Sequence, residues 1–281
     1  DQDYGDYVYD HLTEIIDQYQ PDVLWADIGY PSKGRLDQIL SYYFDKVPNG
    51  VVNDRWEAFD FLGRIANYPG GAWVLKHFAK WSLSQESDPL LDQPQRYGFK
   101  TEEYAELAGI PSFKWESTRG LGGSFGFNRN EVAADMLTGP QLIHYLVDVV
   151  SKNGNLLINV GPDSHGTIPE IQQTPLRELG NWMQIHGEAI YGTRPWIRYG
   201  DTSAEGLEIR YTYKDKQLYA TVLGQVNDTL TLPSPLPDVH EVELMGHGPV
   251  TYQLSVDGLH IQLDNKPLAP QAAYTFILQL K

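Results

Sequence analysis

The sequence predicts an α/β region built around a parallel sheet, followed by a smaller all-β region. Helix-like and strand-like segments alternate with short connections from residue 4 to about residue 190, which favours crossover helices around parallel strands. After Gly192, apolar and polar residues alternate at a period of two, which is typical of antiparallel strands. We therefore expect an α/β domain over residues 1–194 and an antiparallel β-sandwich over residues 195–281.

The individual elements follow from hydrophobic spacing and from turn residues. Apolar residues at helical spacing mark helices, and Pro21 and Asn153-Gly154 stop two of them. Short apolar runs bounded by Gly, Pro, Asn or Asp mark strands. The expected elements are helix 4–19, strand 22–26, helix 36–44, strand 51–52, strand 112–118, helix 139–152, strand 155–160, helix 169–190 and a sandwich of six to eight strands.

Composition excludes several classes of function. The chain has 37 acidic and 21 basic side chains and a net charge of −16, which argues against binding to nucleic acid or to an anionic membrane. It has no cysteine, and its eight histidines show no HExxH spacing, so no metal site is expected. No apolar run is long enough to span a membrane. No phosphate-binding loop or GxSxG elbow occurs, and no cofactor is expected.

Polar side chains gather where the expected parallel strands end. Asp27 follows the apolar run Val23-Leu24-Trp25, at the end of a strand where α/β barrels place their chemistry, although Asp before Gly and Pro also suits a plain turn. Two carboxylates in an aromatic pocket are what glycoside hydrolysis needs. An ionised nucleophile benefits from a neighbouring cation, and the acid from an apolar neighbourhood. The other polar residues at strand ends are Asn53, Asp54, Arg55, Glu103, Glu116 and Asn159.

Six ordered motifs resemble those of the retaining α-L-fucosidases of glycoside hydrolase family 29. The resemblance covers almost the whole chain, and the order of the motifs makes it more specific than any one of them. The motifs are Trp25-Ala-Asp-Ile-Gly-Tyr-Pro31, Val52-Asn-Asp-Arg-Trp56, Phe99-Lys-Thr-Glu-Glu-Tyr104, Lys114-Trp-Glu116, Gly123-Ser-Phe-Gly-Phe-Asn-Arg-Asn130 and Asn155-Leu-Leu-Ile-Asn-Val-Gly-Pro162.

The resemblance implies roles for particular residues. Asp27 matches the family's nucleophile and Glu103 its acid/base, with Glu116 as the second candidate for the acid/base. In an extended strand Glu103 would share a face with Phe99 and Thr101, opposite Glu102. The resemblance implies fucose contacts for Trp25, Arg55 and Phe125.

The resemblance also implies a fold and partners. The chain would hold the second half of a TIM-like α/β barrel and the C-terminal β-sandwich, because family members carry about half a barrel before the first helix. Barrel closure would then need an upstream segment or a second chain. Hydrolysis of fucosylated oligosaccharides or glycoconjugates is expected, and the alternatives are a non-catalytic fucose-binding fragment or one subunit of a split fucosidase. The long stretch between Trp56 and Tyr97 is expected to shape the side of the site that holds the aglycone.

Overall fold

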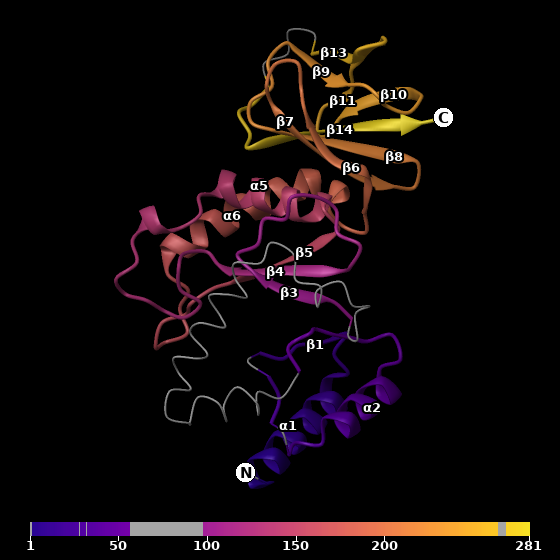
Figure 1. Ribbon diagram of the computed structural model, residues 1–281. Helices are drawn as coiled ribbons and strands as arrows, with labels where there is room; N and C mark the ends of the chain where they lie inside the picture. The colour runs from indigo at the N-terminus through magenta and orange to yellow at the C-terminus, as the bar shows by residue number, and fades with distance from the viewer. Residues whose placement is uncertain (1, 28, 32, 57–97, 264–267) are drawn as a thin grey trace, which may run out of the picture. The chain divides into compact units, whose positions relative to one another are not determined.

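The computed structural model describes residues 2–27, 29–31, 33–56, 98–263 and 268–281 (Figure 1). The chain divides into two compact units, residues 1–101 and residues 102–281. The division falls within strand β3 (Lys100–Glu103). The stretch between Trp56 and Tyr97, for which a role beside the aglycone is expected, lies outside the described residues.

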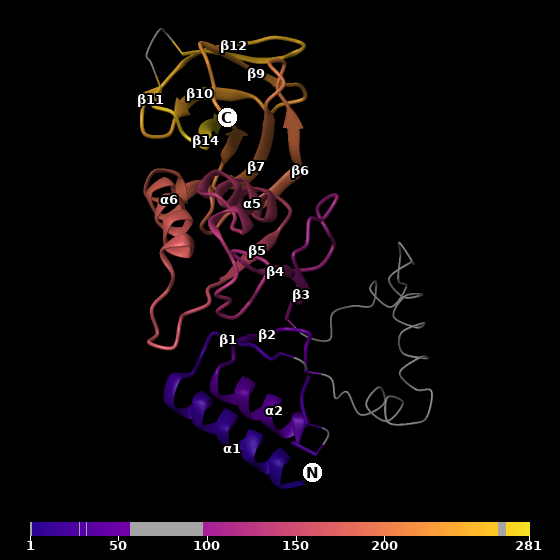
Figure 2. The ribbon, with the colours of Figure 1, turned by 90° about the vertical axis from the view of Figure 1, so that its left-hand side faces the viewer.

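The first unit pairs two helices with two short parallel strands. It contains α1 (Gln2–Tyr19), β1 (Val23–Leu24), α2 (Leu36–Lys46) and β2 (Val51–Val52). The strands are parallel, with Val23 opposite Val51 and Leu24 opposite Val52, and α1 and α2 pack side by side (Figure 2). The apolar positions that predict the helices form the core, since Ile16, Ile39 and Tyr43 are fully buried.

The second unit begins with a sheet of three strands covered by helices. The sheet order is β3, β4 (Trp115–Gly120), β5 (Gly154–Asn159), and β4 and β5 are parallel. Helix α5 (Gly139–Ser151) begins with a capping box, because Thr138 Oγ1 accepts from Gln141 N–H and Gln141 Oε1 accepts from Thr138 N–H. Helix α6 (Glu170–His186) follows β5, and two short 3₁₀ helices, η1 (Ala133–Asp135) and η2 (Gly187–Ala189), complete this part.

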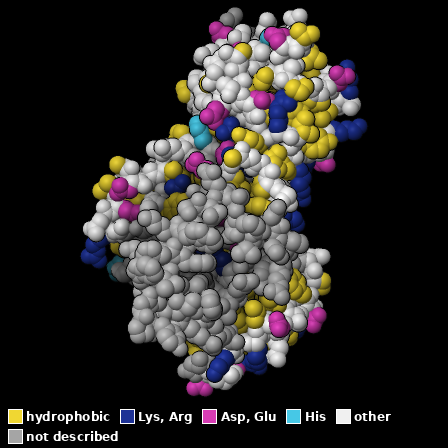
Figure 3. Space-filling model, in the orientation of Figure 1, with side chains coloured by type: hydrophobic (Ala, Val, Ile, Leu, Met, Phe, Trp, Pro, Cys, Tyr) yellow, Lys and Arg dark blue, Asp and Glu magenta, His cyan; other side chains and the backbone are white. Residues whose placement is uncertain are grey.

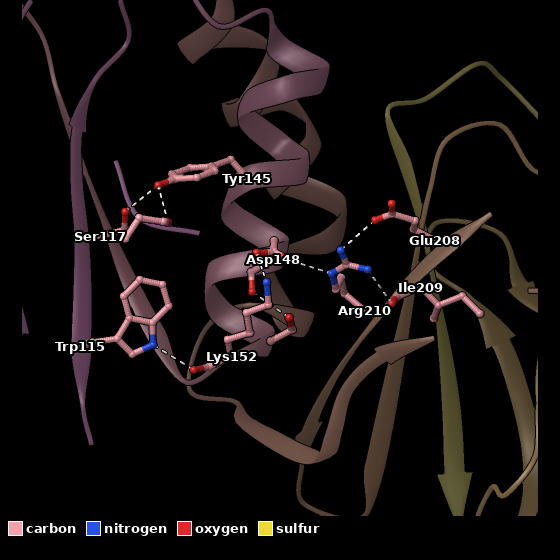
Figure 4. Close-up of polar contacts among 10 residues, drawn as sticks. Trp115, Ser117, Tyr145, Asp148, Lys152, Glu208, Ile209 and Arg210 are labelled. Atoms are coloured by element: carbon pink, nitrogen blue, oxygen red, sulfur yellow. Dashed lines mark hydrogen bonds and ion pairs between the residues drawn. The ribbon is translucent and has the colours of Figure 1, made fainter. Parts of the chain in front are cut away.

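Side-chain contacts show which face of β4 the helices cover. Trp115 Nε1 donates to the carbonyl of Lys152 at 2.9 Å, and Ser117 Oγ lies 2.6 Å from the hydroxyl of Tyr145 on α5 (Figure 4). Successive side chains of a strand point to opposite faces. Glu116 and Thr118 therefore face away from α5.

The C-terminal region contains two antiparallel sheets that share one hydrophobic core. The six-stranded sheet has the order β11-β10-β14-β8-β7-β6, and the three-stranded sheet has the order β12-β13-β9. Leu230 and Ile261 of the smaller sheet join Tyr211 and Phe276 of the larger one in a single buried cluster. The strands are β6 (Arg194–Thr202), β7 (Glu208–Lys214), β8 (Gln217–Leu223), β9 (Thr229–Pro233), β10 (Val239–Leu244), β11 (Gly248–Pro249), β12 (Thr251–Leu254), β13 (Gly258–Gln262) and β14 (Ala273–Leu280).

Helices α5 and α6 form a middle layer of the second unit, between the sheet β3–β5 and the six-stranded sheet (Figures 1 and 2). A charged cluster joins α5 to β7. Asp148 accepts from Arg210 Nε at 2.7 Å and pairs with Lys152 at 2.6 Å, while Arg210 also pairs with Glu208 at 2.8 Å (Figure 4). The helix layer is thus tied to both sheets by polar contacts.

The predicted alternation of helices with parallel strands and the following antiparallel region are confirmed. The prediction of six to eight C-terminal strands is wrong, because nine are present in the described residues; β11 has only two residues and no alternating pattern. Strand 112–118 begins at Trp115 instead, and helix 169–190 ends at His186 and continues as η2. The described strands of the α/β part form a sheet of two and a sheet of three, so a closed barrel stays a prediction.

Among the described residues, no helix is both long enough and apolar enough to cross a membrane. Acidic, basic and apolar side chains are all visible on the described part of the surface in Figure 3.

Candidate active site

An ion pair joins the ends of the two strands of the first unit. Arg55, three residues after β2, places Nη1 2.9 Å from Oδ1 of Asp27, three residues after β1. The Arg55 side chain is 22% exposed and that of Asp27 is 50% exposed, so the carboxylate is open to an incoming molecule while the cation is largely enclosed. Arg55 is thus a cation beside Asp27, and the role of Asp27 as nucleophile stays a prediction.

Trp25 belongs to the same cluster. Its ring lies 5.8 Å from the guanidinium carbon of Arg55 and is partly buried. An aromatic ring beside a cation and a carboxylate offers an apolar wall and polar groups together, which is the combination that a sugar ring recognises. The structure thus brings together Trp25, Asp27 and Arg55, three of the residues predicted for the site.

Two residues between β2 and Arg55 bind the neighbouring strands. Asn53 is fully buried and bonds both backbone groups of Ala26, and its Nδ2 also donates to Thr101 Oγ1 at 3.3 Å. Asp54 Oδ1 accepts from the backbone N–H of Thr101 at 3.0 Å. The sequence places Asn53 and Asp54 among the polar residues at strand ends but gives neither a role, because their partners lie 27 and 47 positions away.

The second unit holds Glu103 and Phe125, connected through Tyr104. Glu103 is the last residue of β3 and is exposed. Tyr104, the next residue, has φ of +52°, an uncommon conformation for a bulky side chain. Its ring packs edge-on against Phe125 at 5.6 Å, and its hydroxyl donates to the Gly122 carbonyl at 3.3 Å.

The glycine-rich loop that carries Phe125 is also held from β5. Asn159, the last residue of β5, donates from Nδ2 to the carbonyl of Phe125. Ser124 N–H donates to Glu131 Oε1 at 3.0 Å. Gly161 lies against the backbone of Gly126, because a Cβ on Gly161 would be 2.6 Å from the carbonyl carbon of Gly126. The Phe125 ring remains 40% exposed on this fixed loop.

Glu116 lies at the opposite end of its sheet. It is the second residue of β4 and pairs with Asn155 at the start of β5, whereas Gly120 pairs with Asn159 at the carboxyl ends. Four residues of strand separate Glu116 from that end, a distance of about 13 Å.

Burial along β3 falls steadily. Phe99, Lys100 and Thr101 are buried, Glu102 is partly buried and Glu103 is exposed. The burial values do not alternate along the strand. They therefore do not test the prediction that Phe99, Thr101 and Glu103 share one face and Glu102 lies on the other. Tyr97, an aromatic residue shortly before this strand in the sequence, lies outside the described residues.

No three His, Asp or Glu side chains converge as a possible metal site anywhere in the described part of the chain. The polar groups named above are carboxylates, amides and guanidinium groups. They fit acid–base and hydrogen-bonding chemistry on a neutral, hydroxylated molecule.

Comparison with known proteins gives the family. A family model described as alpha-L-fucosidase matches residues 1–188, a span that includes Asp27, Arg55, Glu103 and Phe125. The chain belongs to the alpha-L-fucosidase family. The resemblance drawn from the six motifs to glycoside hydrolase family 29 is therefore confirmed.

Mammalian relatives of this fucosidase-family chain are similar over most of its length. It is 32% identical to plasma alpha-L-fucosidase of Rattus norvegicus over 87% of the chain and 49% of the relative. It is 30% identical to plasma alpha-L-fucosidase of Homo sapiens over 90% of the chain and 50% of the relative. The chain thus spans about half the length of the curated relatives it matches.

Solved fucosidase structures share the fold. Thermotoga maritima alpha-fucosidase in complex with a mechanism-based inhibitor is 34% identical with a TM-score of 0.75, over 99% of this chain and 57% of that one. The same enzyme in complex with fucose gives a TM-score of 0.73 at 34% identity, over 98% and 56%. This member of the fucosidase family therefore corresponds to a little more than half of such a structure.

Proposed function

We propose that this protein is a retaining exo-glycosidase that releases α-L-fucose from fucosylated oligosaccharides or glycoconjugates. The observation that carries the proposal is the ion pair between Asp27 and Arg55 beside Trp25, at the ends of adjacent parallel strands in a chain of the fucosidase family. The crystallised relative that binds fucose supports the substrate class.

In the proposed reaction Asp27 is the nucleophile. Its carboxylate attacks the anomeric carbon of fucose and forms a covalent fucosyl–enzyme bond, while Glu103 gives its proton to the departing glycosidic oxygen. Glu103 then takes a proton from water, and the resulting hydroxide equivalent attacks the anomeric carbon and frees Asp27. This route predicts that the two carboxyl groups lie about 5–5.5 Å apart in the active protein.

The position of Glu116 supports Glu103 as the acid/base. Chemistry in an α/β barrel takes place at the carboxyl ends of its strands. Glu103 ends β3, whereas Glu116 lies near the start of β4. Tyr104, the residue after the proposed acid, packs its ring against Phe125.

Trp25, Arg55 and Phe125 are proposed to contact fucose. Trp25 and Phe125 offer partly exposed aromatic surface, which suits the apolar face and the methyl group of the sugar. Arg55 has several N–H donors, and a guanidinium held by Asp27 can also donate to sugar hydroxyls.

Azide rescue tests the nucleophile. Replacement of Asp27 by Gly should abolish nearly all release of fucose from an aryl fucoside, and added azide should restore turnover as fucosyl azide. The configuration of that product reports which carboxylate was lost, because azide enters in place of the missing nucleophile. Normal hydrolysis by the Asp27→Gly variant would rule out the assignment.

The chain's match to about half of its relatives favours a second candidate, in which these residues bind fucose without hydrolysing it or act as one subunit of a split fucosidase. The proposed partner is then the upstream half of the barrel, as a preceding segment or a second chain. It would pair with β1 and with β5, each of which is one end strand of its described sheet. Native mass measurement together with an aryl-fucoside assay separates the cases: an active 31.8 kDa monomer alone would exclude a partner chain.

A further inference from the structure

Asn53 makes a two-point contact with the residue that precedes Asp27. Its Oδ1 accepts from the backbone N–H of Ala26 at 2.9 Å, and its Nδ2 donates to the carbonyl of the same residue at 2.7 Å. Asn53 is fully buried, so water does not compete for these bonds. Both backbone groups of Ala26 are thereby satisfied by one side chain.

The contact between Asn53 and Ala26 lies just beyond the last paired residues of β1 and β2. Strands β1 and β2 pair only through Val23–Val51 and Leu24–Val52. A primary amide presents a donor and an acceptor side by side, as a peptide group does. The Asn53 amide therefore takes the place of a further rung of the ladder and extends the paired region to Ala26.

Ala26 and Asp27 share a peptide bond, so an anchor on Ala26 restricts the position of the Asp27 Cα. Arg55, two residues after Asn53, restrains the carboxylate at the other end of the same side chain. Asp27 is thus held at its backbone by one residue of the segment after β2 and at its carboxylate by another.

We propose that Asn53 is a positioning residue that aims Asp27 at the anomeric carbon through the backbone of Ala26. The proposal rests on the proposed function, in which Asp27 is the nucleophile. A misplacement of the attacking oxygen by about 1 Å costs on the order of 100-fold in rate. Loss of the Asn53 amide should therefore lower kcat much more than it changes KM.

The test compares Asn53→Ala in two backgrounds, in the protein as it occurs naturally. In the otherwise unchanged protein, Asn53→Ala should lower kcat on an aryl fucoside by roughly 10- to 100-fold and change KM by less than about 3-fold. In the Asp27→Gly background with saturating azide, the same substitution should change the rescued rate by less than about 2-fold, because azide does not depend on the aim of Asp27.

A second variant allows the proposal to be tested even if Asn53→Ala does not fold, and a control variant shows whether the effect is specific to Asn53. Asn53→Asp preserves the size of the side chain and the acceptor for Ala26 N–H but loses the donor, and it should give the same contrast between backgrounds if Asn53→Ala does not fold. Asn49→Ala, at an exposed Asn four residues earlier, should leave both rates unchanged.

Two results would overturn the proposal. One is an unchanged kcat in Asn53→Ala. The other is an equal loss in both backgrounds, which would assign Asn53 a purely structural role. Neither result affects the proposed function, because aryl-fucoside hydrolysis by the unchanged protein and azide rescue of Asp27→Gly are measured independently of any Asn53 variant.

Discussion

The guanidinium of Arg55 lies 2.9 Å from Oδ1 of Asp27, and the two residues come from segments 28 positions apart. The pair arises because β1 and β2 are parallel and in register, so the residues that follow them meet at one edge. The proposed nucleophile and the cation beside it are thereby brought together by the pairing of two parallel strands.

Replacement of Arg55 by Met should lower kcat/KM for fucoside hydrolysis by roughly 10- to 100-fold, because a hydrogen bond between charged groups contributes about 1.5–3 kcal/mol. Arg55→Lys should recover only part of the loss, since an ammonium group lacks the planar donors of a guanidinium. Steady-state kinetics on an aryl fucoside measure both variants. Arg177→Met, which breaks an exposed pair with Glu170, is the matched control, and an equal loss there would contradict a specific role for Arg55.

Glu103→Gln should lower kcat/KM by about 10²- to 10⁴-fold on fucosides with poor leaving groups and much less on an activated aryl fucoside. The reason is that only a poor leaving group needs a proton as it departs. Glu116→Gln should leave both rates near those of the unchanged protein, because Glu116 is about 13 Å from the carboxyl end of β4. Measurement of kcat/KM for both variants over a series of fucosides with different leaving groups tests this prediction. The reverse pattern between the two variants would make Glu116 the acid.

Asp148→Asn should lower the free energy of unfolding by about 3–5 kcal/mol, because the buried cation of Lys152 and the largely buried cation of Arg210 lose their shared carboxylate. Thermal or urea unfolding measures the change. Glu170→Gln removes a carboxylate from a pair that is more than half exposed on both sides, and it should change stability by no more than about 0.5 kcal/mol. Similar stabilities of the two variants would show that the cluster between α5 and β7 contributes little.

Stability should fall as the pH is lowered below about 6.5, partly through His186. Burial lowers the pKa of His186, only partly offset by its hydrogen bond to Gln271, and Nδ1 has no hydrogen-bond partner among the described residues. The unfolded chain therefore binds this proton more readily than the folded one. The contribution of His186 is complete above the unfolded pKa and is lost as the pH falls toward the folded pKa.

Urea unfolding of His186→Gln between pH 5 and pH 8 tests this, and the slope of stability against pH should be shallower than in the unchanged protein. His165→Gln, which removes an exposed histidine, is the matched comparison. An unchanged slope in the His186 variant would contradict the prediction.

Local patterns allowed much of the fold to be predicted. Helix α5 was predictable to within a residue, because Pro140 lies in its first turn and the sequence Asn153-Gly154 follows it closely. The strands β1, β2 and β5 were predictable from their short apolar runs, whereas β4, with its polar sequence, begins three residues later than predicted. Strand β11 was not, because two residues, Gly248 and Pro249, carry no periodic signal and pair only through tertiary contact with β10.

The candidate site was predictable by residue type but not by contact. Asp27 and Arg55 stand out because charged residues follow short strands. The contacts of Asn53 with Ala26, and of Asn159 with the carbonyl of Phe125, join residues 27 and 34 positions apart, and no local pattern reports such pairs. Their geometry exists only once the strands have assembled.

The close approach of Gly161 to Gly126 has a consequence for engineering. The segments around Gly126 and Gly161 contact each other through backbone atoms without intervening side chains. Neither segment can therefore be redesigned alone. A chimaera that takes the segment 120–127 from another member of the family should accept it only together with residues 159–162 from the same donor, and a library at position 161 should return glycine. In any redesign of the loop that carries Phe125, the two segments are a single exchangeable part.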